Sequence, residues 1–179
     1  MIRVVKLGGS LLSARVLPAC LAKVADYPGR VVIVPGGGVF ADQVRAAHRQ
    51  WDFDDTAAHR MAILAMQQMA WLFHSLRPDF VVFEKVADAG DCAKEAIWSP
   101  CLQELEQAGI AASWDITSDS LAAWLAGQVA ANELVLVKSC PIEPETPLAR
   151  LLQEGGIDAG FVKFVNRAGF KCSVIINEG

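Results

Sequence analysis

The stretch Val4-Val5-Lys6-Leu7-Gly8-Gly9-Ser10 decides the fold, and a related pattern follows at Val31-Val32-Ile33-Val34-Pro35-Gly36-Gly37-Gly38. In both places a short run of apolar residues, which is typical of a buried strand, breaks into glycines. The residues after each glycine loop have the pattern of a helix. Two successions of strand, glycine loop and helix within the first fifty residues therefore predict an α/β fold.

The glycine loops indicate that the protein binds anions. Glycine allows the backbone to approach a bulky ligand closely, because no side chain shields its N–H group. A helix that begins at such a loop adds the partial positive charge of its unpaired N–H groups. Two loops of this kind can hold two anionic ligands head to head, which favours phosphoryl transfer as the reaction.

The composition limits the class of protein. The chain has 179 residues, which fits one compact domain over residues 1–179. Hydrophobic residues make up 53% of it, which favours a sheet that is buried on both faces. The net charge of −4 lacks the basic surplus of a nucleic-acid-binding protein. No apolar stretch reaches the roughly 18–20 residues that span a membrane, so we expect neither kind of partner.

The cysteines indicate a reducing compartment. Their number, five, is odd, and none of them forms a C-x-x-C pair. No secretory signal precedes them, because Lys6 and the first glycine loop come almost at once. We therefore expect reduced thiols and a cytoplasmic protein.

Strand-like and helix-like patterns alternate along the chain. The pattern predicts strands at Ile2–Leu7, Arg30–Val34, Phe80–Phe83, Ile110–Trp114, Glu133–Val137 and Lys171–Ile176. It predicts helices at Ser13–Asp26, Val39–Arg49, Thr56–Leu76, from Ser99-Pro100 to Ala108, from Thr117 to about Ala131, from Thr146-Pro147 to Gly155-Gly156, and at Ile157–Arg167. Such alternation predicts a three-layer α/β/α sandwich around a mostly parallel central sheet. Ligands bind at the carboxyl ends of such strands, where both glycine loops and Lys138 are expected.

The glycine pattern differs from the common nucleotide motifs. It matches neither G-x-x-x-x-G-K-[ST] nor G-x-G-x-x-G. Four elements follow one another in order: Lys6-Leu7-Gly8-Gly9-Ser10, Pro35-Gly36-Gly37-Gly38, Thr117-Ser118-Asp119-Ser120-Leu121-Ala122-Ala123 and Leu136-Val137-Lys138-Ser139. This order resembles the amino acid kinase family, which includes the acetylglutamate, aspartate, carbamate and uridylate kinases.

Two further stretches resemble a small branch of that family. They are Asp55-x-x-Ala58-His59-Arg60-Met61-Ala62-Ile63-x-Ala65-Met66 and Gly156-Ile157-Asp158-Ala159-x-Phe161. The branch phosphorylates an (aminomethyl)furanyl-methyl phosphate in the synthesis of methanofuran-type C1 carriers. The resemblance implies an enzyme that moves the γ-phosphoryl group of ATP to an acidic acceptor. An acceptor that is already ionised needs no general base, so positioning and charge neutralisation remain as the protein's work.

The resemblance also implies roles for individual residues. Lys6 would bridge the transferring phosphoryl group, Lys138 would contact the nucleotide phosphates, and Asp119 would hold both lysines. The other implied contacts are Gly8, Gly9, Ser10 and Ser139 for the nucleotide phosphates and Gly36, Gly37, Gly38 and His59 for the acceptor. Mg²⁺ would be held by the phosphates, with no protein residue as its dedicated ligand.

Several alternatives remain open at this stage. The lysines can be strand-end cations, Asp119 a helix cap, the three glycines a tight turn and His59 a packing residue. The acceptor can instead be a carboxylate or a nucleoside monophosphate, or the protein can bind nucleotide without catalysis. The prolines and glutamates of Cys140–Glu145 replace the usual turn, which puts the adenine contacts in question. Trp98 or Trp114 can face a ring-shaped substrate, and the apolar helix Thr56–Leu76 favours a homo-oligomer.

Overall fold

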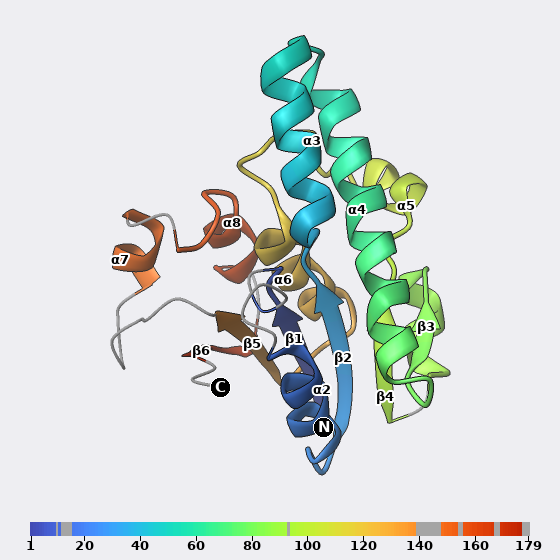
Figure 1. Ribbon diagram of the computed structural model, residues 1–179. Helices are drawn as coiled ribbons and strands as arrows, with labels where there is room; N and C mark the ends of the chain where they lie inside the picture. Colours follow the sequence, from blue (N-terminus) through green and yellow to red (C-terminus); the bar gives the residue numbers. More distant parts are fainter. Residues whose placement is uncertain are drawn as a thin grey trace.

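A computed structural model describes residues 1–9, 11, 16–92, 94–138, 148–153, 156–166 and 169–176. Its described strands form one parallel sheet in the order β3-β4-β2-β1-β5-β6 (Figure 1). Their bounds are β1 Ile2–Leu7, β2 Arg30–Pro35, β3 Val81–Phe83, β4 Glu95–Trp98, β5 Glu133–Lys138 and β6 Lys171–Ile176. The predicted α/β class with a parallel central sheet is confirmed.

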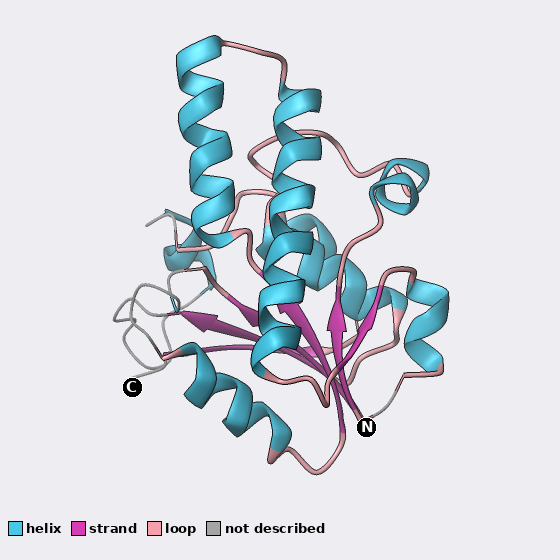
Figure 2. Cartoon of the chain, turned by 45° about the vertical axis from the view of Figure 1, so that its right-hand side comes forward, coloured by secondary structure: helices cyan, strands magenta, loops and turns pink. Residues whose placement is uncertain are grey.

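Helices cover both faces of this sheet (Figure 2). Their bounds are α2 Leu17–Ala25, α3 Gly38–Trp51, α4 Asp55–Leu76, α5 Leu102–Gln107, α6 Ser118–Gln128, α7 Leu148–Gln153 and α8 Phe161–Val165, with a 3-10 helix η1 at Val86–Gly90. The α3–α4 pair rises beyond the carboxyl ends of the central strands (Figure 1). Among the described helices, none is both long and apolar enough to span a bilayer.

The alternation of side chains along the central strands fixes the position of the two lysines. In β1, Val4 packs into the core cluster that contains α6, and Val5 packs into the cluster that contains α2. In β5, Leu136 belongs to the α6 side. Because every second residue of a strand points to the same face, Lys6 follows Val4 and Lys138 follows Leu136 toward α6. The pattern of the strands thus directs both ammonium groups to one helix.

The long helix α4 links the two core clusters. Ile63, in its first half, packs on the α6 side of the sheet, whereas Phe73, in its second half, packs on the α2 side. Asp54 begins the helix as its N-cap, and its side chain accepts a hydrogen bond of 2.8 Å from the N–H of Ala57. The expected turn and the expected helix over Thr56–Leu76 are therefore both present, with α4 beginning one residue earlier.

One predicted strand is wrong and one strand was not foreseen. Ile110–Trp114 forms no strand, because Gly109 turns the chain at φ +71° and the segment then crosses the carboxyl edge of the sheet toward α6. The place in the sheet belongs to β4, which pairs with β2 on one side and β3 on the other. Trp98 ends β4 fully buried, and its indole N–H donates to the Glu84 carbonyl. Trp98 therefore does not face a ring-shaped substrate.

Three helix boundaries also differ from the expectation. The helix predicted from Ser99-Pro100 begins at Leu102, because the Ser99 N–H continues the strand pairing to the Phe83 carbonyl. The helix predicted over Ile157–Arg167 is confined to α8, because Asp158 instead binds the start of α6. Of the helix predicted over Ser13–Asp26, the structure describes α2, which begins at Leu17. The predicted start at Thr146-Pro147 lies outside the described residues.

Candidate active site

Lys6, Asp119 and Lys138 meet where β1, β5 and α6 come together. One carboxylate oxygen of Asp119, Oδ1, lies 2.9 Å from Lys6 Nζ, and the other, Oδ2, accepts a hydrogen bond of 2.7 Å from Lys138 Nζ. The side chains of Lys6 and Asp119 are each only 7% exposed. Asp119 is in the first turn of α6, so this single carboxylate ties the helix to two strands.

The charges of this group depend on one another. Burial alone raises the pKa of the Asp119 carboxyl, but the charges and hydrogen bonds of Lys6 and Lys138 outweigh it and leave the pKa below its usual value. Asp119 is therefore ionised at neutral pH. Lys6 pairs with Asp119 Oδ1 at 2.9 Å, and because an ammonium group carries three N–H donors, Lys6 keeps donors for another acceptor. Two ammonium groups against one carboxylate leave the group with a net positive charge.

The two glycine loops touch each other beside this group. A Cβ on Gly9 would lie 2.2 Å from the Cα of Gly38, and a Cβ on Gly36 would lie 3.1 Å from the Gly9 N atom. The Gly36 N–H also continues the strand pairing to the Leu7 carbonyl at 2.9 Å. Gly38 has φ +54°, a conformation that glycine adopts at no steric cost. Side chains on these residues would force the loops apart, so the glycines are required by packing as well as by any ligand.

An open cleft of about 500 Å³ lies over the lysines and the loops. Its lining includes Lys6, Gly9, Gly36, Gly37, Gly38, Asp119 and Lys138, which are seven of the eleven residues predicted for the site. Gly8 is buried and does not line the cleft, and a Cβ on Gly36 would lie 3.5 Å from its Cα. Ser10 and Ser139 lie outside the described residues.

The structure adds Asp158, to which the sequence had assigned no role. Its Oδ2 accepts hydrogen bonds from the Thr117 N–H at 2.9 Å, the Thr117 hydroxyl at 2.7 Å and the Ser120 N–H at 3.0 Å. Its Oδ1 accepts a hydrogen bond from the Ser120 hydroxyl. Asp158 thus satisfies the N-terminal donors of α6 and holds the turn that carries Asp119. The only signal in the sequence was its place in the stretch Gly156–Phe161.

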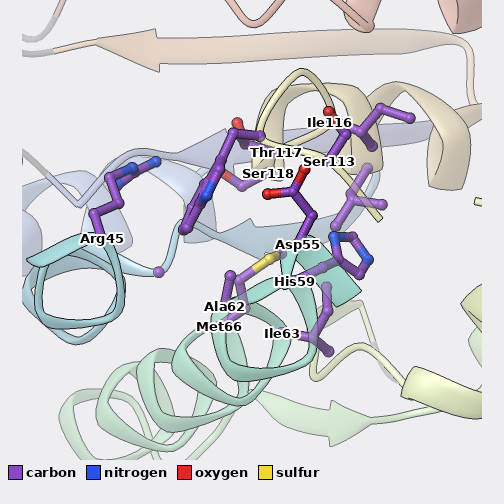
Figure 3. Close-up of a pocket in the computed structure, with 13 residues that line it drawn as sticks. Arg45, Asp55, His59, Ala62, Ile63, Met66, Ser113, Ile116, Thr117 and Ser118 are labelled. Carbon is purple, nitrogen blue, oxygen red and sulfur yellow. The ribbon is translucent and has the colours of Figure 1, made fainter. Parts of the chain in front are cut away.

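A second, much smaller chamber of about 40 Å³ adjoins the cleft (Figure 3). The two cavities share Gly37, Arg45, Thr117 and Ser118 in their walls. The remaining lining residues of the chamber are Asp55, His59, Ala62, Ile63, Met66, Ser113, Trp114, Ile116 and Leu121. His59 therefore lies in the side chamber, apart from the lysines, and Trp114 takes part in the same wall.

The polar residues around the chamber are ordered by contacts among themselves. The Arg45 guanidinium lies over the Trp114 ring, 4.7 Å from its centroid, and reaches Asp42 at 3.2 Å. The Trp114 indole N–H donates to His48 Nδ1 at 3.1 Å. Burial lowers the pKa of His59, and the nearby negative charge of Glu106 offsets part of that shift. His59 is therefore neutral at pH 7, in contrast to the charged lysines of the cleft.

Comparisons with known proteins agree with this geometry. The [5-(aminomethyl)furan-3-yl]methyl phosphate kinase of Methanocaldococcus jannaschii is 28% identical over a match that covers 74% of this chain. The chain spans only 63% of the length of that relative. The crystal structure of uridylate kinase from Archaeoglobus fulgidus has a TM-score of 0.70 at 20% identity and covers 99% of this chain and 91% of its own.

The aspartate kinase of Synechocystis has a TM-score of 0.73 at 12% identity over all of this chain and 38% of its own. At these identities the two structures show the fold alone. In sequence, the amino acid kinase family matches residues 1–141, which include both glycine loops, Asp119 and Lys138. Since this match extends over most of the chain and over every part of the lysine group, the chain belongs to the amino acid kinase family.

Proposed function

We propose that the protein is an ATP-dependent kinase that transfers the γ-phosphoryl group to a furanyl-methyl phosphate and so makes a diphosphate for the synthesis of a C1-carrier cofactor. The observation that carries the proposal is the buried group of Lys6, Asp119 and Lys138 beneath an open cleft at the junction of two glycine loops. The name of the curated relative supports the choice of acceptor.

The arrangement suits the transfer of a phosphoryl group between two anions. Charge gathers on the oxygens of the transferred group in the transition state, and fixed cations in a sheltered site stabilise it without reorganising. Lys6 and Lys138 supply that charge, and Asp119 holds the two ammonium groups on either side of its carboxylate. Each glycine loop seats one ligand, so the two ligands meet above Lys6.

The reaction itself needs no general base. An oxygen of the acceptor phosphate, already ionised at pH 7, forms a bond to the γ-phosphorus, and the bond from that phosphorus to the β–γ bridging oxygen breaks to release ADP. Within the described residues, no three His, Cys, Asp or Glu side chains converge as a metal site. Both oxygens of Asp119 already face ammonium groups. Mg²⁺ would accordingly be carried by the nucleotide phosphates and would neutralise part of their charge.

The direct test is to incubate the protein with ATP, Mg²⁺ and [5-(aminomethyl)furan-3-yl]methyl phosphate and to follow the diphosphate by phosphorus NMR. We expect Lys6→Ala to lower kcat on the order of 100-fold or more, since it removes one preorganised donor to the transferred group. The matched control is Lys171→Ala, because Lys171 is exposed and begins β6 at the opposite end of the sheet. That variant should keep the wild-type rate.

Three results would change the proposal in different ways. Acyl phosphate trapped by hydroxylamine from a carboxylate acceptor, or transfer to a nucleoside monophosphate, would keep the kinase and replace the acceptor. ATP binding without transfer to any acidic acceptor would indicate a catalytically silent nucleotide-binding protein. A folded Lys6→Ala variant with undiminished activity would remove Lys6 from the reaction.

A further inference from the structure

We infer that the small chamber beside the cleft is a recognition site for a primary ammonium group, and that Asp55 and His59 select acceptors that carry one. The inference rests on the proposed function, because it concerns the non-reacting end of the acceptor. It assigns a place to the amine of that acceptor and adds a residue, Asp55, that had no role in the site.

The size and position of the chamber define what it can hold. At about 40 Å³ it has room for about one water molecule, which is far too little for a ring and a phosphate. An ammonium group is close to a water molecule in size. The chamber lies directly beside the cleft, because Gly37, Thr117 and Ser118 line both cavities next to the second glycine loop. A ligand whose phosphate lies in the cleft can therefore place only its opposite end group in the chamber.

The polar atoms of the chamber favour a donor with a positive charge. The Asp55 carboxylate offers hydrogen-bond acceptors, and the neutral ring of His59 offers one further acceptor nitrogen. In Figure 3 the Asp55 carboxylate points toward the loop that carries Ser113, Thr117 and Ser118. The Ser113 and Ser118 hydroxyls can also accept. An ammonium group brings three donors to this set, whereas a second anion would meet the charge of Asp55.

His59 gives the independent indication that a ligand belongs here. Only 9% of the residue is exposed, and within the described parts of the chain its ring makes no hydrogen bond. A ring nitrogen that has no hydrogen-bond partner in the protein is available to pair with a bound group. Its ring is part of the chamber wall, so a group bound in the chamber would meet it. The neighbouring Ile63 and Met66 supply an apolar wall that strengthens such a contact.

Arg45 does not make the chamber a site for anions. Its guanidinium stacks on Trp114 and pairs with Asp42, which lines the cleft rather than the chamber. Arg45 lies in the wall that the chamber shares with the cleft, where the acceptor phosphate would bind. His48 lies 3.7 Å from Asp55 at the outer side, and more than half of the Asp55 side chain is exposed. The acceptor thus meets a cation near its phosphate and a carboxylate near its far end.

The experiment compares two acceptors in wild-type protein and in Asp55→Asn. One is the aminomethyl furan phosphate, and the other is its analogue with a methyl group in place of the aminomethyl group. We expect the wild type to favour the amine by about 10- to 100-fold in kcat/KM, the range for hydrogen bonds to a charged group. Asp55→Asn should remove that preference by lowering kcat/KM for the amine and leaving the methyl analogue unchanged. His59→Gln, which keeps an acceptor atom, should lose less.

Asp52→Asn is the matched control. It removes the same charge three residues earlier, and Asp52 has φ +48°, which asparagine also tolerates. Its preference for the amine should equal that of the wild type. Equal use of both acceptors by the wild type, or an equal loss of both in Asp55→Asn, would overturn the amine site and leave the kinase intact. If neither acceptor is phosphorylated, the proposed function fails, and the amine site is then tested by titration calorimetry of the two acceptors. Tighter binding of the amine than of the methyl analogue, lost in Asp55→Asn, supports the site. Equal binding of both compounds, or an amine preference that Asp55→Asn keeps, overturns it.

Discussion

The carboxylate of Asp119 lies between the ammonium groups of Lys6 and Lys138. The contribution of its negative charge to stability can therefore be measured. We predict that Asp119→Asn lowers the free energy of unfolding by about 3 kcal/mol at pH 7, because it removes the negative charge that faces both Lys6 and Lys138 in a buried place. The pKa of the Asp119 carboxyl is lowered in the folded protein. Its stabilisation is therefore fully present above the unfolded pKa of about 3.9 and is lost as the pH falls through the folded pKa.

Urea denaturation of wild type and Asp119→Asn at pH 7 and at pH 3 measures this contribution. The two proteins should differ most at pH 7, and the difference should narrow at pH 3, below the unfolded pKa, as protonation of Asp119 begins to favour the unfolded wild type. Asp79→Asn is the control, since Asp79 forms an exposed ion pair with Arg77 and should change stability little at either pH. A difference between wild type and Asp119→Asn that is the same at both pH values would show that shape rather than charge matters at this position.

Gly9 tests the contact between the two glycine loops. We predict that Gly9→Ala lowers both stability and kcat, because its Cβ would lie 2.2 Å from the Cα of Gly38, where no flexible side chain can move away. A forced shift of this kind costs about 1–3 kcal/mol. Gly127→Ala is the comparison, because a Cβ there meets nothing within 4 Å and alanine favours a helix. Thermal unfolding and initial rates of both variants give the answer.

At the scale of elements, α6 depends on a residue from another part of the chain. We predict that Asp158→Ala lowers stability by about 1–2 kcal/mol, since the Thr117 and Ser120 N–H groups lose their acceptor. It should also lower kcat, because the same turn holds Asp119 against the lysines. Asp158→Asn, which keeps an oxygen acceptor, should lose less of both. Hydrogen exchange should be faster at the start of α6 in Asp158→Ala and unchanged in α4, and equal exchange in α6 would contradict the role.

The sequence predicts the central strands and the family, but not the short strand β4 or the contacts between distant segments. The predicted family and fold class are confirmed. They could be predicted because β1, β2 and β5 are continuous apolar runs and because a glycine loop follows β1 and β2 directly. The strand β4 was missed because four residues carry too little pattern, and its place depends on pairing with β2 and β3. Asp158 acts over 38 to 41 residues, and the contact exists only in the folded chain. The chamber around His59 likewise joins segments that the sequence keeps apart.

At the scale of the whole molecule, α4 has two faces with different properties. One face carries His59, Ile63 and Met66 in the chamber. Outside it, Met61, Leu64 and Trp71 are 39%, 52% and 58% exposed, a rare arrangement for large apolar residues. Their spacing of three and seven residues is that of helices that pack against one another. We therefore predict that the protein forms a homodimer in which α4 packs on α4 about a two-fold axis.

Light scattering at micromolar concentration measures the oligomeric state. We expect a dimer for the wild type and a monomer for Leu64→Glu combined with Trp71→Glu, because two charges would be buried in the contact. Val81→Glu, which changes an apolar residue of β3 that is 41% exposed, should remain a dimer. Because α4 carries the contact on one face and the chamber on the other, the monomeric variant should show a raised KM for the acceptor with an unchanged KM for ATP. A wild-type monomer would show instead that the apolar face of α4 is simply exposed to solvent.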